Sequence, residues 1–161
     1  MSDTVIIADL YFYELYSDKI RIKLTLQNTS GNSLLVVLPI FLEEQIIFNH
    51  LAMDDAFRCP IGSFITVDKK MNLLALEAHE SKEYLFNFYR ETVDSCDNID
   101  MLFFFTGEPG DYECHFEWEF DETFVCPYTH FTYDDILSYI KTLNVTLFEG
   151  KIESNVVSVH I

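Results

Sequence analysis

The chain has 161 residues, of which 49% are hydrophobic and 16% aromatic. This length can bury the core of one domain, and the chain is too apolar to be disordered despite its net charge of −17. We therefore expect a single domain over residues 1–161. The 27 acidic and 10 basic residues make nucleic acid and anionic membranes poor partners, and they suit either plain solubility or a partner with a basic surface.

The sequence shows neither a membrane-spanning segment nor a secretory signal. The longest apolar run, SLLVVLPIFL (33–42), is about half the length of a membrane span and contains a proline. The N-terminus has no basic region before its apolar residues, so no secretory signal is expected in this sequence. A cytoplasmic location is favoured, and a periplasmic or secreted location stays open if a signal was trimmed.

The first half of the chain alternates apolar and polar residues with a period of two, which indicates β-strands. In KIRIKLTLQN (19–28) the even-numbered residues from Ile20 to Leu26 share one face, and NTSGN then ends the strand. The run 33–42 reads as a buried strand whose Pro39 indicates an edge or a bulge. QIIFNHLAM (45–53) fits either a strand or a helix.

The second half continues the pattern. LLALEAHESKEYLFNF (73–88) reads as two strands around a polar turn, and IDMLFFFTG (99–107) reads as another apolar strand before the turn GEPGD. In DYECHFEWEFDE (111–122) the aromatic residues and Cys114 share one face, while His115 and the glutamates take the other. About seven to nine strands at this spacing predict an all-β, antiparallel sandwich.

One segment breaks the strand pattern. FTYDDILSYIKTLN (131–144) places Thr132 as an N-cap with Asp135 three residues later. Ile136, Ile140 and Leu143 follow at helical spacing. We expect a short amphipathic helix near 132–143, inserted before the last strand and packed on one end of the sandwich.

Cysteine and histidine side chains are potential metal ligands. The four cysteines contain no CxxC pair, so free thiols are the default, and a Cys59–Cys126 disulfide stays open. Cys114, His115, Cys126 and His130 occur in a short stretch. However, neighbours on a strand point to opposite faces, so Cys114 and His115 cannot both join one site. We expect no metal and no cofactor, with zinc as the alternative.

The acidic stripe Glu113, Glu117 and Glu119 is the strongest candidate surface. General acid–base catalysis needs two carboxyl groups in contrasting environments, whereas one exposed strand face gives all three the same environment. The sequence contains no phosphate-binding glycine loop, nucleophile elbow or HExxH motif. We therefore predict no catalytic residues and no enzyme. The pattern favours a solvated face for the stripe, and if the stripe is functional it indicates a docking surface for lysine and arginine.

The end of the chain carries a family resemblance. Gly110-Asp111-Tyr112 opens one long strand, and GKIESNVVSV (150–159) follows the pattern G-x-I-x-S-N-x-V-x-V. These features resemble the last two strands of bacterial immunoglobulin-like sandwich domains, and 73–88 looks like the mid-chain hairpin of that family. The resemblance implies an immunoglobulin-like fold and leaves the function open. In the last strand we expect Gly150 to permit a bulge or a close backbone approach, and Ser154 and Asn155 to bond local backbone.

Size, acidity and the missing catalytic motifs together predict a non-enzymatic protein-binding domain. It would be an acidic immunity or antitoxin-type protein, or an inhibitor of a basic effector or protease. The alternatives are a secreted or surface adhesion module and, less favoured, a metal-dependent hydrolase. The residues expected to contact the partner are Glu113, Glu117, Glu119, Tyr128, His130, Tyr133, Asp134 and Asp135.

Overall fold

The computed structural model describes residues 5–15, 19–39, 42–50, 58–61, 72–90, 102–105, 110–126, 130–141 and 143–160. Its elements are β1 (Ile6–Leu15), β2 (Lys19–Asn28), β3 (Leu34–Leu38), the 3-10 helix η1 (Leu42–Gln45), β4 (Ile46–His50), β5 (Arg58–Ile61), β6 (Asn72–Leu76), β7 (Ser81–Arg90), β8 (Leu102–Phe105), β9 (Asp111–Phe120), α1 (Tyr133–Ile140), β10 (Thr146–Leu147), β11 (Gly150–Glu153) and β12 (Val157–His160). The predicted all-β sandwich with one short helix is confirmed, and the segment 45–53 that fitted either type contains a strand.

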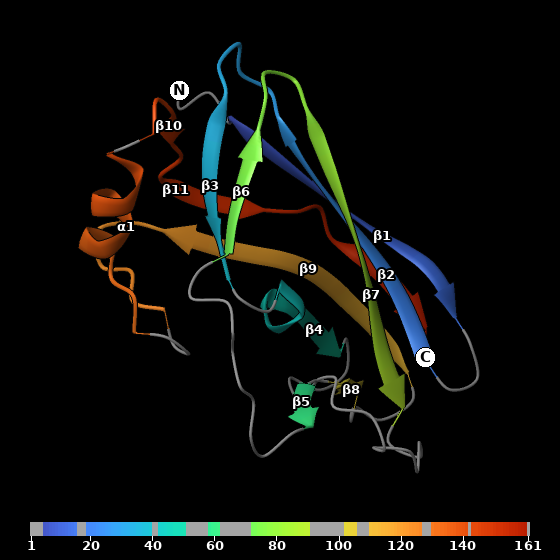
Figure 1. Ribbon diagram of the computed structural model, residues 1–161. Helices are drawn as coiled ribbons and strands as arrows, with labels where there is room; N and C mark the ends of the chain where they lie inside the picture. The colour runs from blue at the N-terminus through green and yellow to red at the C-terminus, as the bar shows by residue number, and fades with distance from the viewer. Residues whose placement is uncertain are drawn as a thin grey trace.

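The strands form three sheets (Figure 1). One contains β1, β2, β7, β8 and β5 in that order, and a second contains β10, β3 and β6. In the third, β9 pairs with β4 on one side and with β11 and β12 on the other. The pairings are antiparallel except for β7 with β8 and β10 with β3, which are parallel. Figure 1 shows β9 and β11 crossing the direction of β1, β2 and β7, with α1 at one end of β9.

A bent ribbon of strands joins the first two sheets. β2 and β3 follow each other in the chain and pair with β7 and β6 respectively, so the ribbon folds back where both connections turn. We call these connections, residues 28–33 and 77–80, the corner. The predicted hairpin over 73–88 is therefore wrong: β6 and β7 follow each other through a tight turn, but each pairs with a different strand.

The corner is held by a buried polar side chain. Asn28 is fully buried, and its Nδ2 donates to the backbone oxygens of Asn32, Leu76 and Glu77 at 2.8, 3.3 and 3.0 Å. Its Oδ1 accepts from the backbone N and the Oγ of Ser30 at 2.9 and 2.8 Å. Buried amides are tolerated when they are satisfied in this way, and here the bonds tie both connections of the corner together.

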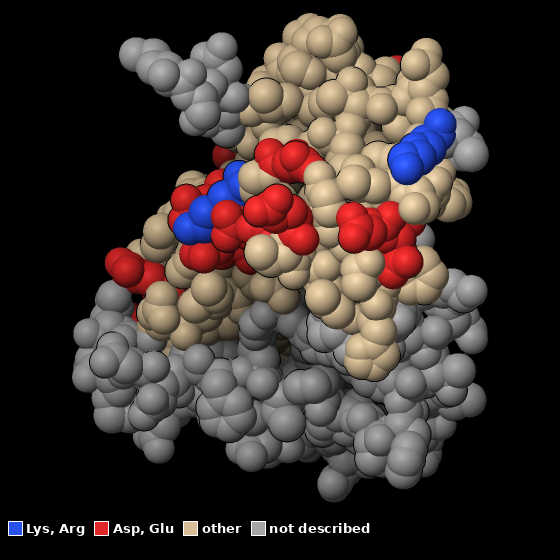
Figure 2. Space-filling view, turned by 90° about the vertical axis from the view of Figure 1, so that its left-hand side faces the viewer, with Lys and Arg blue, Asp and Glu red and all other residues tan. Residues whose placement is uncertain are grey.

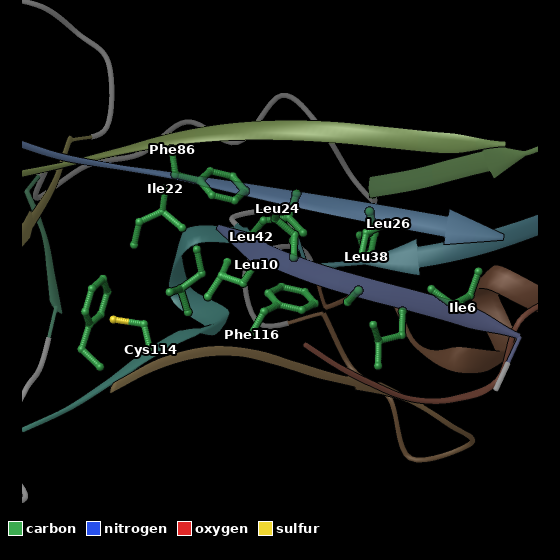
Figure 3. Close-up of a cluster of buried hydrophobic side chains, with 14 of the residues drawn as sticks. Ile6, Leu10, Ile22, Leu24, Leu26, Leu38, Leu42, Phe86, Cys114 and Phe116 are labelled. Atoms are coloured by element: carbon green, nitrogen blue, oxygen red, sulfur yellow. The ribbon is translucent and has the colours of Figure 1, made fainter. Parts of the chain in front are cut away.

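The main core lies between the first and third sheets. The inward residues of β2 are buried as the alternation predicts, with Ile20 and Leu24 at zero exposure. They meet apolar side chains from β1, β3, β4, β7 and β9. Figure 3 shows Ile22 and Phe86 lying across this interior from Phe116. This packing explains why the aromatic-rich face of β9 points inward and its glutamates point outward.

The helix α1 packs on a second, smaller hydrophobic cluster. Val37, Phe120 and Ile136 are buried together there. All five residues of β3 are buried, because the main core covers one face of the strand and this cluster covers the other. A continuous apolar run is typical of a strand covered on both faces.

The helix ends earlier than predicted. α1 stops at Ile140 with Lys141 as its C-cap, and the backbone N of Leu143 donates to the oxygen of Ile140 at 2.8 Å. This tighter turn takes Leu143 off the buried stripe and leaves it 43% exposed, so its predicted inward position is wrong. The N-cap at Thr132, with its capping box to Asp135, is confirmed.

The last stretch of the chain closes the sandwich as two strands rather than one. We call residues 150–155 the seam. The backbone N of Ser154 donates to the oxygen of Phe116 at 2.9 Å, and its Oγ accepts from the N of Phe116 at 2.8 Å. The expectation that the side chain of Asn155 bonds local backbone is wrong. Its side chain accepts from the N of Leu10 at 2.7 Å and donates to the oxygen of Leu10 at 3.0 Å, thereby joining β1.

Candidate protein-binding surface

The outward face of β9 carries the predicted acidic stripe. Glu113, Glu117 and Glu119 share this face with His115, because the alternate residues of the strand are buried in the core. β11 pairs with β9 so that Lys151 lies opposite Glu119 and Glu153 lies opposite Glu117. The sheet therefore extends the stripe from one strand to two.

Lys151 links the two strands of this face. Its Nζ lies 2.8 Å from Glu153 and 3.3 Å from Glu117, so one ammonium group separates two carboxylates that face each other across the strands. The hydrogen bond to Glu153, with a smaller contribution from Glu117, raises the pKa of Lys151 above its usual value. His115 approaches Glu117 at 3.7 Å. Lys151 therefore balances part of the negative charge of Glu117 and Glu153.

Acidic side chains gather across the middle of this side of the molecule (Figure 2). Among the described residues, exposed or half-buried acids lie on the outward faces of β9 and β11 and in the first turn of α1. We call Glu113, Glu117, Glu119, Glu153 and Asp134 the acidic surface. All five are exposed or half-buried. Their negative charges are therefore accessible from solvent.

Asp134 and Asp135 take different roles at the start of α1. The carboxylate of Asp135 accepts from the backbone N and the Oγ1 of Thr132 at 2.8 and 2.9 Å. These bonds lower the pKa of Asp135, so the cap is formed when the group is ionised and is lost as the pH falls through that lowered pKa. Asp135 is therefore committed to the helix, while Asp134 is exposed beside it.

The remaining predicted contacts lie around the same helix. The ring of Tyr133 packs 5.7 Å from that of Phe120, and its hydroxyl donates to Glu149, which raises the pKa of Tyr133. Tyr133 thus fastens α1 to the segment between β10 and β11. His130 is exposed and has a positive φ of 58°. Tyr128 lies outside the described residues.

The candidate metal ligands do not converge. Cys114 is buried in the main core, and burial raises the pKa of its thiol to about 12, so the thiol is neutral near pH 7. His115 points to the opposite face of β9, as predicted. Cys126 is a free, buried thiol, and the side chain of Cys59, its possible disulfide partner, lies outside the described side chains. Within the described ranges, no group of three or more potential ligands comes together.

The sequence analysis missed one residue of the acidic surface, Glu153, and two that lie near it in the chain, Lys151 and Glu149. Lys151, Glu153 and Glu149 come after the inserted helix, and only strand register brings the first two beside the stripe. Their alternation with the buried Ile152 was visible and could have placed them on an outward face. Pairing with β9 was the part that alternation alone could not supply.

The chain was compared with known proteins in three ways. No protein-family model matches it, and neither a curated protein nor a solved structure was found that does. The resemblance to bacterial immunoglobulin-like domains therefore stays a prediction. Among the described residues, no helix is long and apolar enough to cross a membrane.

Proposed function

We infer that the protein is a non-enzymatic binding domain whose acidic surface docks on a basic surface of another protein. The observation that carries this proposal is the two-strand acidic face of β9 and β11. There Lys151 already occupies the space between Glu117 and Glu153 in the manner of a partner's lysine. The net charge of −17 would steer such a partner toward the domain.

The finer proposal is an immunity, antitoxin-type or inhibitory role. A partner that is a basic effector or protease would be bound and neutralised through complementary charge, without any chemistry on the part of this chain. The paired sheet supports this role, because the backbone of the stripe residues is held in place before binding and loses little conformational freedom.

Charge reversal tests the proposal. Lysates of the source cells are passed over the immobilised wild-type chain, over E117K/E119K and over D9K/E83K. The last is the matched control, since Asp9 and Glu83 flank Thr25 on the outer face of the other sheet and the net charge changes equally. We expect a protein retained by wild type and D9K/E83K but released from E117K/E119K. That protein should also elute as salt is raised, because charge attraction between exposed groups is screened.

The purified partner then gives a quantitative result. Its affinity should fall by at least about tenfold for E117K/E119K at low salt and change little for D9K/E83K. Equal losses in the two variants would reduce the effect to net charge and contradict the assignment of the acidic surface. Circular dichroism of each variant checks that the fold is retained.

A further inference from the structure

A histidine lies inside the acidic stripe. On the outward face of β9, His115 stands between Glu113 and Glu117, because alternate residues of a strand share a face. Its Nε2 lies 3.7 Å from Oε2 of Glu117, and the two side chains are 22% and 40% exposed. A histidine in this position can bring a positive charge into the middle of the stripe.

Glu117 has a basic side chain beside each of its two carboxylate oxygens. The Nζ of Lys151 lies 3.3 Å from Oε1 of Glu117, whereas His115 approaches Oε2. Lys151 also binds Glu153, at 2.8 Å. The ammonium group of a lysine is charged at neutral and at mildly acidic pH, whereas a histidine ring changes its charge between about pH 5 and 8. Of these two neighbours of Glu117, His115 is therefore the one whose charge depends on pH in that range.

The elements on both sides of β9 determine which other charges surround His115. The described side chains of η1 and β4 are uncharged, and Ile47 of β4 lies directly opposite His115. On the other side of β9, β11 supplies Lys151 and Glu153. Together with the two glutamates that flank His115 on β9, this region has three carboxylates and one ammonium, which leaves two negative charges unbalanced while His115 is neutral. A proton on His115 would balance one of them.

A second histidine of this sheet has a different setting. His160 at the end of β12 lies 2.6 Å from Asp111, but these two side chains are 79% and 65% exposed. Water screens a pair this exposed, so the charge of His160 has little effect on its surroundings. The side chain of His115 is less exposed and lies between two glutamates, so its charge acts directly on the stripe.

We propose that His115 is a pH-sensitive element of the acidic surface. Protonation of its ring places a second cation beside Glu117, so less negative charge remains for a basic partner. The partner should therefore bind more tightly at neutral pH than in mildly acidic solution. Because linked equilibria are reciprocal, a bound basic partner should in turn displace the proton from His115. This inference rests on the proposed function and adds its regulation.

An oligolysine peptide of fixed length tests the proposal with the full chain at low salt. Between about pH 7.5 and about pH 5.5, lysine stays protonated and ordinary carboxyl groups stay ionised, so histidine accounts for a change in affinity. We expect the affinity of the wild type to fall by about fivefold over this range, and H115Q to lose most of this dependence. Calorimetry in buffers of different ionisation enthalpy should show that binding releases protons at about pH 6.5 from the wild type but not from H115Q.

The chain offers a closely matched control. H160Q makes the same change at a histidine that also pairs with a carboxylate on this sheet. This variant should keep the pH dependence of the wild type. An unchanged pH dependence in H115Q, or an equal loss of it in H115Q and H160Q, overturns the role of His115 and leaves the acidic surface in place. If E117K/E119K binds oligolysine at neutral pH as tightly as the wild type does, the proposed function itself fails.

Discussion

The corner and the seam perform similar tasks with similar residues. Each is a short, largely polar stretch that joins two layers of strands, and each contains one glycine and an asparagine whose side chain bonds to backbone atoms of another segment. In the corner, Asn28 is fully buried, and Gly31 has no neighbouring atom within 4 Å of the position of an added Cβ. In the seam the pattern is reversed: Asn155 is exposed, whereas Gly150 has a φ of +133°. The same residue type can therefore be essential in one place and replaceable in the other.

The largest effect is expected from Asn28→Ala. Removing the side chain takes its donor from three backbone oxygens and its acceptor from the N–H of Ser30. The oxygens of Asn32 and Glu77 each keep another donor, so the loss falls mainly on the oxygen of Leu76 and the N–H of Ser30. Buried groups left unsatisfied cost about 1 to 3 kcal/mol each, and water entering the vacated space offsets part of this. We expect a loss of about 3 kcal/mol in the free energy of unfolding, measured by urea denaturation.

Asn32→Ala is the matched control for that prediction. Asn32 contributes its backbone oxygen to the corner, and this atom is retained in the variant. The free energy of unfolding should change by no more than about 0.5 kcal/mol. Equal losses for the two asparagines would mean that the corner depends on turn propensity and not on the buried amide.

Gly150→Ala is expected to rank second. An added Cβ at this position meets only the Cζ of Phe148 at 3.8 Å, which is ordinary contact, so crowding is not the cause. The cost comes from the backbone, because a φ of +133° is one that residues with a side chain rarely adopt. We expect a loss of about 2 kcal/mol in urea denaturation. An unchanged midpoint would show that β11 can begin in another conformation.

Much of the fold could be predicted from the sequence because alternation encodes burial directly. β2, β9 and the cap of α1 were placed correctly from Ile20 to Leu26, from Tyr112 to Phe120, and from Thr132. What could not be predicted was pairing between distant strands. Alternation does not reveal that β6 pairs with β3 or that Asn155 reaches Leu10, since both depend on how the layers close.

The candidate surface was likewise predictable within one strand but not across paired strands. The stripe on β9 followed from the period of one strand, whereas Lys151 and Glu153 joined it through register with a second strand. Asp135 and Tyr133 were identified as residues of interest, but their side chains serve the helix cap and the packing of α1. The sequence does not show whether a charged or aromatic side chain is already engaged in contacts within the fold.

Asn155→Ala is expected to have a smaller effect than Asn28→Ala or Gly150→Ala. The variant loses two bonds to Leu10, but the site is near solvent, so water can replace part of them. We expect a loss of about 1 kcal/mol and faster hydrogen exchange at the Leu10 amide. Val156→Ala, at a neighbouring side chain that is 58% exposed, should leave that amide protected. If the exchange rate of Leu10 is the same in both variants, the bond to Asn155 does not protect β1.

The smallest effect, and the one with the opposite sign, is expected from Gly31→Ala. Gly31 lies in the corner between Ser30 and Asn32, its φ is not in the left-handed region, and an added methyl group would meet open space. Alanine restricts the unfolded chain more than glycine does, so a substitution that fits the native backbone should stabilise by about 0.5 kcal/mol. Urea denaturation beside Gly150→Ala therefore compares the same chemical change in the two regions. A gain at Gly31 with a loss at Gly150 would locate the requirement for glycine in the seam, where β11 begins. A loss at both positions would mean that the corner also needs a flexible backbone, and that Asn28 alone does not hold it.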